Sequence, residues 1–139
     1  MPYTWTVDHG TRTILVRGTG AAMTADTLRL IEEMKDVVRE SPDYDFLYNS
    51  AALQIQSNAA DMVKVANALF RDSGARFRRF AIVVPPSRVA LARIFAALAH
   101  PFGVSANVFD DEESAREWLA AKARERGAEP GGPRPSLEP

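Results

Sequence analysis

Hydroxyl and amide side chains between positions 49 and 58 are the groups in this chain best suited to bind a ligand. Asn49 and Ser50 follow an apolar run, and Ser57 and Asn58 precede an amphipathic segment typical of a helix. Exposed amides at a helix N-terminus stabilise anions, so a phosphate on Ser57, or a free anion, would be favoured there. Alternatively, Ser57 or Asn58 caps the helix with support from Asp61. These four residues are the candidate binding residues.

Arginines form a second candidate site around the start of a later apolar run. Arg76, Arg78 and Arg79 lie close together in the sequence, and guanidinium groups suit phosphate and carboxylate partners. We predict an anion patch here, while the alternative is a solvated flank that protects the strand from aggregation. Few aromatic residues interleave with these arginines, so we expect no nucleic-acid interface.

Other residue patterns give little support to catalysis. The chain has two histidines, His9 and His100, and no G-x-S-x-G, H-E-x-x-H or P-loop spacing. A serine–histidine pair in space stays open, but we expect a protein that is not an enzyme. Gly18-Thr19-Gly20 lacks a third glycine and is interpreted as a loop. The acidic run 110–113 is interpreted as a helix start rather than a cation site, and we expect no metal and no cofactor.

Composition narrows the class of protein further. The 139 residues carry a formal net charge of −1, contain no cysteine and are 46% hydrophobic, as in an ordinary globular domain. No disulfide or thiolate metal site can form. No segment is apolar and long enough to span a bilayer, and the N-terminus lacks the pattern of a signal peptide, so we expect a cytoplasmic protein.

Hydrophobic periodicity predicts an α/β domain over residues 1–122. Alternation at 3–7 and the run 13–17, separated by turn residues, predict an antiparallel hairpin. Further short strands are expected at 46–48, 80–84 and 105–109. Helices are expected from Thr24 as N-cap, from Ser57 or Asn58, after 85–87, and after 110–111. This order predicts a mixed β-sheet of about five strands with four helices. The Pro- and Gly-rich segment 123–139 is predicted to be a disordered tail.

Several of these features together resemble the STAS superfamily, in particular the SpoIIAA-like proteins. The resemblance covers roughly residues 3–122 and is strongest in the C-terminal half. It rests on the strand order and on two stretches, Arg78-Arg79-Phe80-Ala81-Ile82-Val83 and Val108-Phe109-Asp110-Asp111-Glu112-Glu113-Ser114-Ala115-Arg116-Glu117-Trp118-Leu119. It implies a STAS/SpoIIAA-like fold and a binding or signalling module.

The resemblance also implies partners. STAS domains that antagonise anti-sigma factors have a phosphorylatable serine where this chain has Ser57, so the resemblance implies Ser57 as the candidate phospho-switch. Gln56 and Ala59 replace the flanking aspartate and glycine of that signature. A protein partner, either a regulator or a kinase, or a small ligand is therefore expected near the second helix. SpoIIAA-like domains also resemble the lipid-binding CRAL-TRIO fold, which makes a carrier of an apolar molecule the alternative. A groove lined by Phe70, Phe95, Leu98 and Phe102 would serve it. A homodimer is a further hypothesis that nothing in the sequence fixes.

Overall fold

The computed structural model describes residues 2–128, with side chains described up to residue 122. In chain order the elements are β1 (Tyr3–Asp8), β2 (Thr13–Ala22), α1 (Thr24–Arg39), β3 (Tyr44–Ile55), α2 (Ala59–Ala66), the π-helical turn η1 (Asn67–Asp72), β4 (Phe77–Val83), the 3₁₀ turn η2 (Pro86–Arg88), α3 (Val89–Ala99), the 3₁₀ turn η3 (His100–Phe102), β5 (Ser105–Phe109) and α4 (Glu112–Ala128). The predicted order of strands and helices is confirmed.

The strands form one mixed sheet in the order β1-β2-β3-β4-β5. The opening hairpin pairs β1 with β2 in antiparallel register, and every other neighbouring pair is parallel. The fold class predicted from the sequence, a five-stranded mixed sheet with an N-terminal hairpin and four helices, is therefore confirmed. Because β3 is the central strand and its neighbours β2 and β4 run in the same direction, their carboxyl ends meet at one edge of the sheet.

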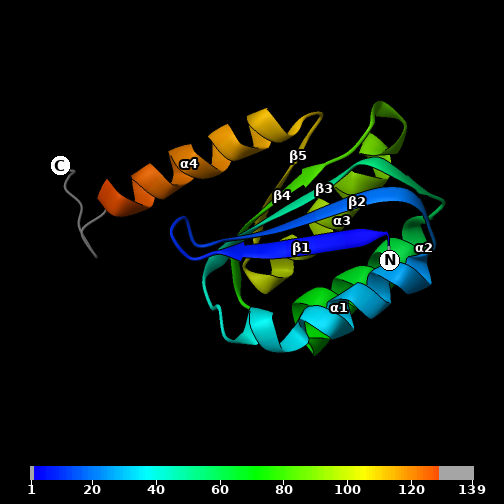
Figure 1. The fold of residues 1–139 in the computed structure, drawn as a ribbon, viewed down its shortest axis with the longest axis horizontal. Helices are drawn as coiled ribbons and strands as arrows, with labels where there is room; N and C mark the ends of the chain where they lie inside the picture. Colours follow the sequence, from blue (N-terminus) through cyan, green and yellow to red (C-terminus); the bar gives the residue numbers. More distant parts are fainter. Residues whose placement is uncertain (1, 129–139) are drawn as a thin grey trace.

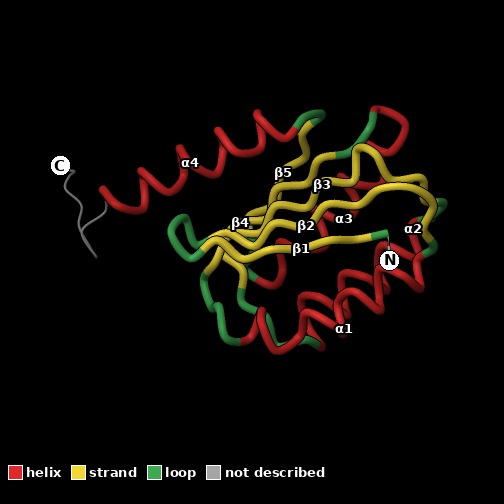
Figure 2. Tube along the Cα trace, viewed as in Figure 1, coloured by secondary structure: helices red, strands yellow, loops and turns green. Residues whose placement is uncertain are grey.

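Helices cover both faces of the sheet, but unequally. Helices α1, α2 and α3 lie against one face and α4 lies alone against the other (Figures 1 and 2). The apolar run of β4 contributes side chains to the cores on both faces of the sheet, as its lack of polar alternation predicts. Phe80 and Ile82 point into the large core under α1–α3, and Ala81 and Val83 join Leu119 in a small core under α4.

Strands β2 and β3 are longer than the sequence pattern predicts. The glycines of Gly18-Thr19-Gly20 do not end β2 in a loop; they lie within the strand, which is irregular between Arg17 and Thr19. Gly18 is required by close packing, because a Cβ there would lie 3.0 Å from a ring carbon of Tyr3 and 3.1 Å from a methyl of Leu53. The predicted loop was wrong because glycines often end strands, whereas these two glycines lie within a paired strand.

Strand β3 reaches Ile55, so the expected loop from Asn49 onwards is mostly strand. Parallel pairing with β2 sustains it up to Ala22 and Ile55. On its other side, pairing with β4 ends at Asn49 and Val83. The last residues of β3 therefore have a strand neighbour on one side only.

The helix boundaries also differ slightly from the prediction. The N-cap of α1 is Met23 rather than Thr24, and its amide donates to the Asp26 carboxylate at 2.8 Å. The helical backbone of α4 continues to Ala128, past the boundary predicted after residue 122. The predicted tail otherwise falls on 129–139, which lie outside the described residues. In the described chain, no helix has the length and apolarity needed to cross a membrane.

Candidate functional site

An apolar cavity of about 110 Å³ lies between the sheet and the three helices α1, α2 and α3. Its walls come from β3, β4 and the facing sides of the helices, and almost all are apolar. They include Leu30, Ile31, Met34, Val38, Phe46, Ile55, Met62, Val65, Leu69, Phe80, Ile82, Val84, Leu91, Ala92 and Phe95. Native cores hold few voids larger than a water molecule. A cavity of this size and composition is suited to a small apolar group.

The cavity wall also includes polar side chains, several of which lie near the end where β3 extends beyond β4. They are Thr24, Thr27, Tyr48, Ser50, Ser57 and Arg88. Thr24 and Ser57 lie opposite each other at the starts of α1 and α2, and their hydroxyl oxygens are 3.3 Å apart. Deeper along β3, the Tyr48 and Tyr3 hydroxyls are 3.1 Å apart, and the Tyr3 hydroxyl is 2.8 Å from that of Thr27. Burial raises the pKa of Tyr48 well above its usual value, so this hydroxyl stays neutral.

Arg88 takes the place of the missing strand neighbour of β3. It lies in the connection between β4 and α3, and its guanidinium donates to the Leu53 carbonyl at 2.7 Å. It also donates to the Ser50 carbonyl and, at 3.2 Å, to the Ser50 hydroxyl. Since β4 has already ended, these carbonyls would otherwise lack a strand partner on that side. The result is a cation fixed at the polar end of an apolar cavity.

An open groove of about 830 Å³ adjoins this polar end. It shares Thr24, Ile55 and Arg88 with the cavity and is otherwise formed by the β2–α1 connection, the end of β3 and the segment after β4. Met23 lines the groove with 71% of its surface exposed. Ligands of open α/β sheets commonly bind at the carboxyl ends of the strands, which is where the groove lies.

The four candidate binding residues do not form one cluster. Ser50 and Ser57 line the cavity. Asn58 is the N-cap of α2: its side chain accepts from the Asp61 amide at 2.9 Å, and its own amide donates to the Asp61 carboxylate at 3.0 Å. Asn49 lies on the opposite face of the sheet, because successive side chains of a strand alternate between faces. The structure therefore brings Ser50 and Ser57 together with Thr24 and Arg88, residues that the sequence did not single out as ligands.

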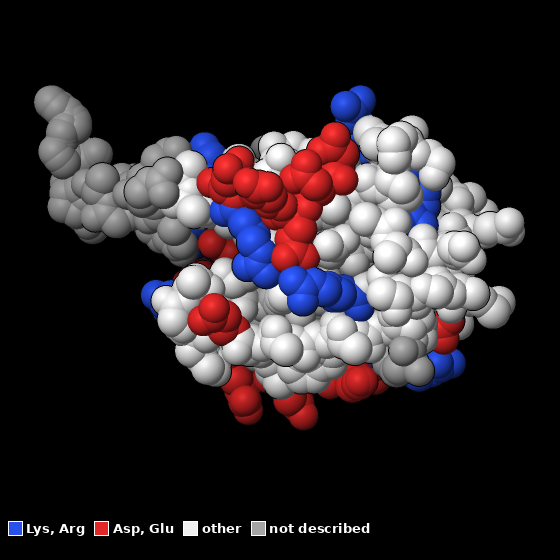
Figure 3. Space-filling model, turned by 45° about the horizontal axis from the view of Figure 1, so that its top comes forward, with Lys and Arg blue, Asp and Glu red and all other residues white. Residues whose placement is uncertain are grey.

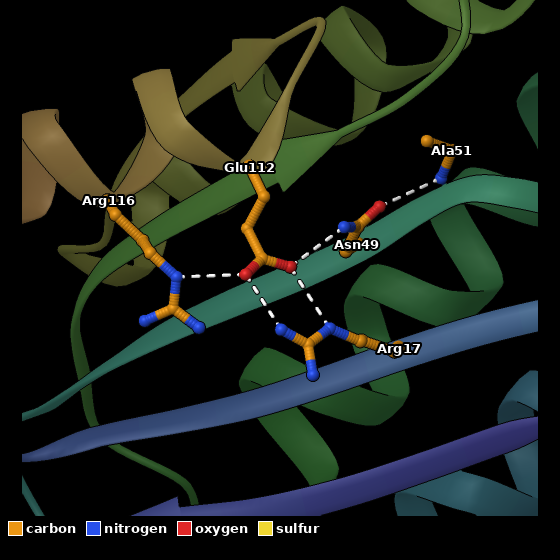
Figure 4. Close-up of polar contacts among 5 residues, drawn as sticks. All are labelled: Arg17, Asn49, Ala51, Glu112 and Arg116. Carbon is orange, nitrogen blue, oxygen red and sulfur yellow. Dashed lines mark hydrogen bonds and ion pairs between the residues drawn. The ribbon is translucent and has the colours of Figure 1, made fainter.

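Asn49 belongs instead to a polar cluster that attaches the first turn of α4 to the sheet (Figure 4). Glu112 accepts two hydrogen bonds from Arg17, at 3.1 and 2.8 Å, one from Asn49 at 2.9 Å and one from Arg116 at 2.9 Å. These donors, Arg17 first, lower the pKa of Glu112 to about 2. Figure 3 shows acidic and basic side chains side by side over this part of the surface. Both oxygens of the Glu112 carboxylate accept hydrogen bonds within this cluster, which is typical of a structural role.

The acidic run 110–113 forms a helix start, as expected. α4 begins at Glu112, and the Asp111 carboxylate accepts the Ser114 amide at 2.7 Å. Within the described residues, no group of three side chains that could ligate a metal comes together.

The three arginines of the predicted anion patch differ in their exposure to solvent. Arg76 is exposed and Arg78 is partly exposed, but Arg79 is buried under α4 in an ion pair with Asp45, at 3.3 Å. Arg79 is therefore held within the protein, and an anion patch at Arg76 and Arg78 stays a prediction.

Both histidines lie far from the polar end of the cavity. His9 is in the β1–β2 turn, where its Nδ1 is 2.8 Å from the Tyr44 hydroxyl at the start of β3. His100 follows the C-terminus of α3. Both positions are at the amino ends of the parallel strands, whereas Ser57 follows the carboxyl end of β3. The serine–histidine pair that the sequence left open does not form with Ser57.

The aromatic groove expected between the second and third helices is not the cavity that the structure contains. Phe70 packs against Phe95 and Phe102 with ring centroids 5.3 and 6.0 Å apart, and of the four residues named for the groove only Phe95 lines the cavity. The sequence pattern did not predict that α1 and α2 would lie on either side of a cavity. The one sequence feature that could have indicated this site was Arg88, a charged residue between a proline pair and an apolar helix.

Comparison with known proteins identifies similar structures and one matching family. A search of curated proteins finds no match. An uncharacterised protein with a SpoIIAA-like fold from Shewanella loihica PV-4 has a similar structure: TM-score 0.58 and 16% identity, covering 84% of this chain and 93% of the other. An anti-sigma factor antagonist from Mycobacterium paratuberculosis is also similar: TM-score 0.50 and 15% identity, covering 85% and 94%. The SpoIIAA-like family model matches residues 13–120. The resemblance seen in the sequence is thus confirmed, and the chain belongs to the SpoIIAA-like family.

Proposed function

We propose that this domain is a non-catalytic binding module that takes a small apolar ligand into the cavity between the sheet and helices α1–α3, through the groove near the start of α2. The carrying observation is the cavity itself, whose walls are mostly apolar and whose few polar groups include Thr24 and Arg88, the two polar residues that it shares with the groove. Binding sites for small molecules commonly combine mostly apolar walls with a few convergent polar groups.

The absence of catalysis in this proposal is supported by the positions of the reactive side chains. The Ser57 hydroxyl has the Thr24 hydroxyl as its neighbour, and both histidines lie at the other end of the parallel strands. A nucleophilic serine needs a base within hydrogen-bonding reach. The polar groups of the cavity can orient a ligand, but they contain no such base.

A change that fills the cavity tests the proposal. Ala92 lines the cavity, and Ala66, equally apolar and buried on the neighbouring helix α2, does not. We expect Ala92→Leu to occupy the void and exclude the ligand, while the matched control Ala66→Leu keeps it. Protein purified from its own host would be weighed by native and denaturing mass spectrometry. The proposal predicts an excess mass that is released on denaturation in the wild type and the control but is missing from Ala92→Leu. A bare chain in all three would contradict it.

A protein partner is the second candidate function. It is supported by the structural neighbour described as an anti-sigma factor antagonist and by Met23, an exposed apolar side chain in the groove. On this hypothesis Ser57 would act as a switch, since a phosphate there would change the charge beside the groove. Crosslinking in the host, followed by mass spectrometry, should give one product that Met23→Glu and Ser57→Asp remove. Val63→Glu is the control, because Val63 is also exposed but lies outside the groove. A product lost equally in all three would count against this site.

A further inference from the structure

The charge that lines the cavity and its groove is positive only. Among the described residues that line either space, Arg88 is the one charged side chain, and no Asp, Glu or Lys is present. The hydrogen-bond partners of Arg88 are the Leu53 and Ser50 carbonyls and the Ser50 hydroxyl, all of which are neutral. No carboxylate of the described chain forms an ion pair with it. A partly buried cation held only by neutral acceptors has a positive charge that a bound anion could neutralise.

The N-terminus of α3 adds to the positive charge of Arg88, whereas acidic residues offset the N-termini of α1 and α2. α1 and α2 have Asp26 and Asp61 in their first turns, and both carboxylates accept backbone amides there. α3 has no acidic residue in its first turn and begins directly after Arg88. The positive end of the α3 dipole therefore adds to the charge of Arg88 without an internal carboxylate to offset it.

The cavity also limits the size of the apolar part of a ligand. Its volume is about 110 Å³, somewhat below the roughly 150 Å³ of an engineered apolar cavity that binds benzene. A hydrocarbon group of about five carbons therefore fits, and a long lipid chain does not fit without rearrangement. The polar end near Arg88 must then hold whatever headgroup the ligand carries.

We infer that the ligand is a short amphipathic carboxylate, whose carboxylate group lies against Arg88 and whose hydrocarbon tail fills the cavity. This inference rests on the proposed function and adds the headgroup and the length of the tail. Three N–H groups of the guanidinium are used by Leu53 and Ser50, which leaves two of its five for a ligand in the described structure. The hydroxyls of Ser57 and Thr24, at the same end, can donate to the second carboxylate oxygen.

The test compares probes with similar six-carbon chains whose headgroups are charged or neutral. Hexanoate, hexanamide and 1-hexanol share nearly the same size and tail, and their binding to the wild-type protein would be measured by isothermal titration calorimetry. We expect hexanoate to bind at least about tenfold more tightly than the amide or the alcohol, since a charge-assisted hydrogen bond is about twice as strong as a neutral one. The preference should disappear in acid, where hexanoate becomes neutral.

The outcomes separate this inference from the function on which it rests. Equal binding of all three probes would overturn the anionic headgroup and leave the apolar binding function standing. Binding of none would overturn both. Arg88→Gln should reduce the preference to about one, and Arg88→Lys should keep most of it. Because Arg88 also holds the end of β3, a circular dichroism melt would check that each variant folds. If Arg88→Gln does not fold, the acid series on the wild type and Arg88→Lys still decide the result.

Discussion

Replacing Glu112 with Gln should destabilise the protein in a way that depends on pH. The Glu112 carboxylate joins α4 to β2 through Arg17 and to β3 through Asn49, and it also accepts a hydrogen bond from Arg116, one turn further along α4. Its pKa falls from 4.5 to about 2 in the folded protein. A tenfold change in proton affinity is about 1.36 kcal/mol, so the full shift corresponds to ~3.4 kcal/mol. Arg17 and Arg116 are each 52% exposed and therefore screened by solvent, so we expect an actual loss of about 1–2 kcal/mol for Glu112→Gln at pH 7.

The direction of the pH effect follows from the lowered pKa. A carboxylate that is more acidic in the folded state stabilises the protein fully above its unfolded pKa of 4.5, and loses this contribution as the pH falls towards 2. Urea unfolding of the wild type and Glu112→Gln at several pH values would measure the difference. The gap in the free energy of unfolding should be largest near pH 7, shrink below pH 4.5 and be small near pH 2.

Glu113→Gln is the matched control for this prediction. Glu113 lies in the same first turn of α4, so its replacement costs the same interaction with the helix dipole, but its side chain is exposed. We expect a change within about 0.5 kcal/mol at every pH. An equal loss in both variants, or a loss in Glu112→Gln that does not change between pH 7 and pH 2, would refute the explanation by the Glu112 cluster.

Three further changes test other parts of the structure by urea unfolding. Asn58→Ala should cost about 1 kcal/mol because α2 loses its N-cap, while Asn58→Asp should cost little; equal costs would contradict the cap. Gly18→Ala should destabilise by about 1–2 kcal/mol, because the new methyl meets the Tyr3 ring and Leu53, and a neutral result would show that this packing is loose. Ala92→Leu should cost clearly less than Ala66→Leu, since only the first side chain has a void to fill; the reverse order would argue that the cavity is closed in solution.

The sequence predicted the order of elements and the layers well, because those depend on local periodicity. The alternation at Tyr3, Trp5 and Val7 and the continuous run around Ile82 correspond directly to burial on one face and on two. The lengths of β2 and β3 were underestimated for a different reason. Gly18 and the polar residues Asn49 and Ser50 look like strand ends in the sequence. In the structure Gly18 pairs with Tyr3 of β1, and Asn49 pairs with Arg17 of β2 and Val83 of β4, so the strands continue past these positions.

The candidate site was predicted only in part. Ser57 and Ser50 were expected near a binding site and both line the cavity, but whether they bind anything stays a prediction. Asn49 was grouped with them although strand alternation places neighbouring residues on opposite faces once β3 is extended. Arg88 was not selected, because its importance comes from where β4 ends relative to β3, and sequence patterns do not contain that register.

Methyl NMR with hexanoate as probe tests the central claim, that the cavity takes up an apolar ligand, most directly. The methyl groups of Ile31, Ile82 and Leu91 line the cavity, whereas those of Leu47, Val83 and Leu119 lie in the small core under α4 on the other face. We predict saturable shifts and ligand-to-protein nuclear Overhauser effects at the first set and none at the second. No saturable shift, or contacts confined to the second set or to the outer surface, would contradict the claim.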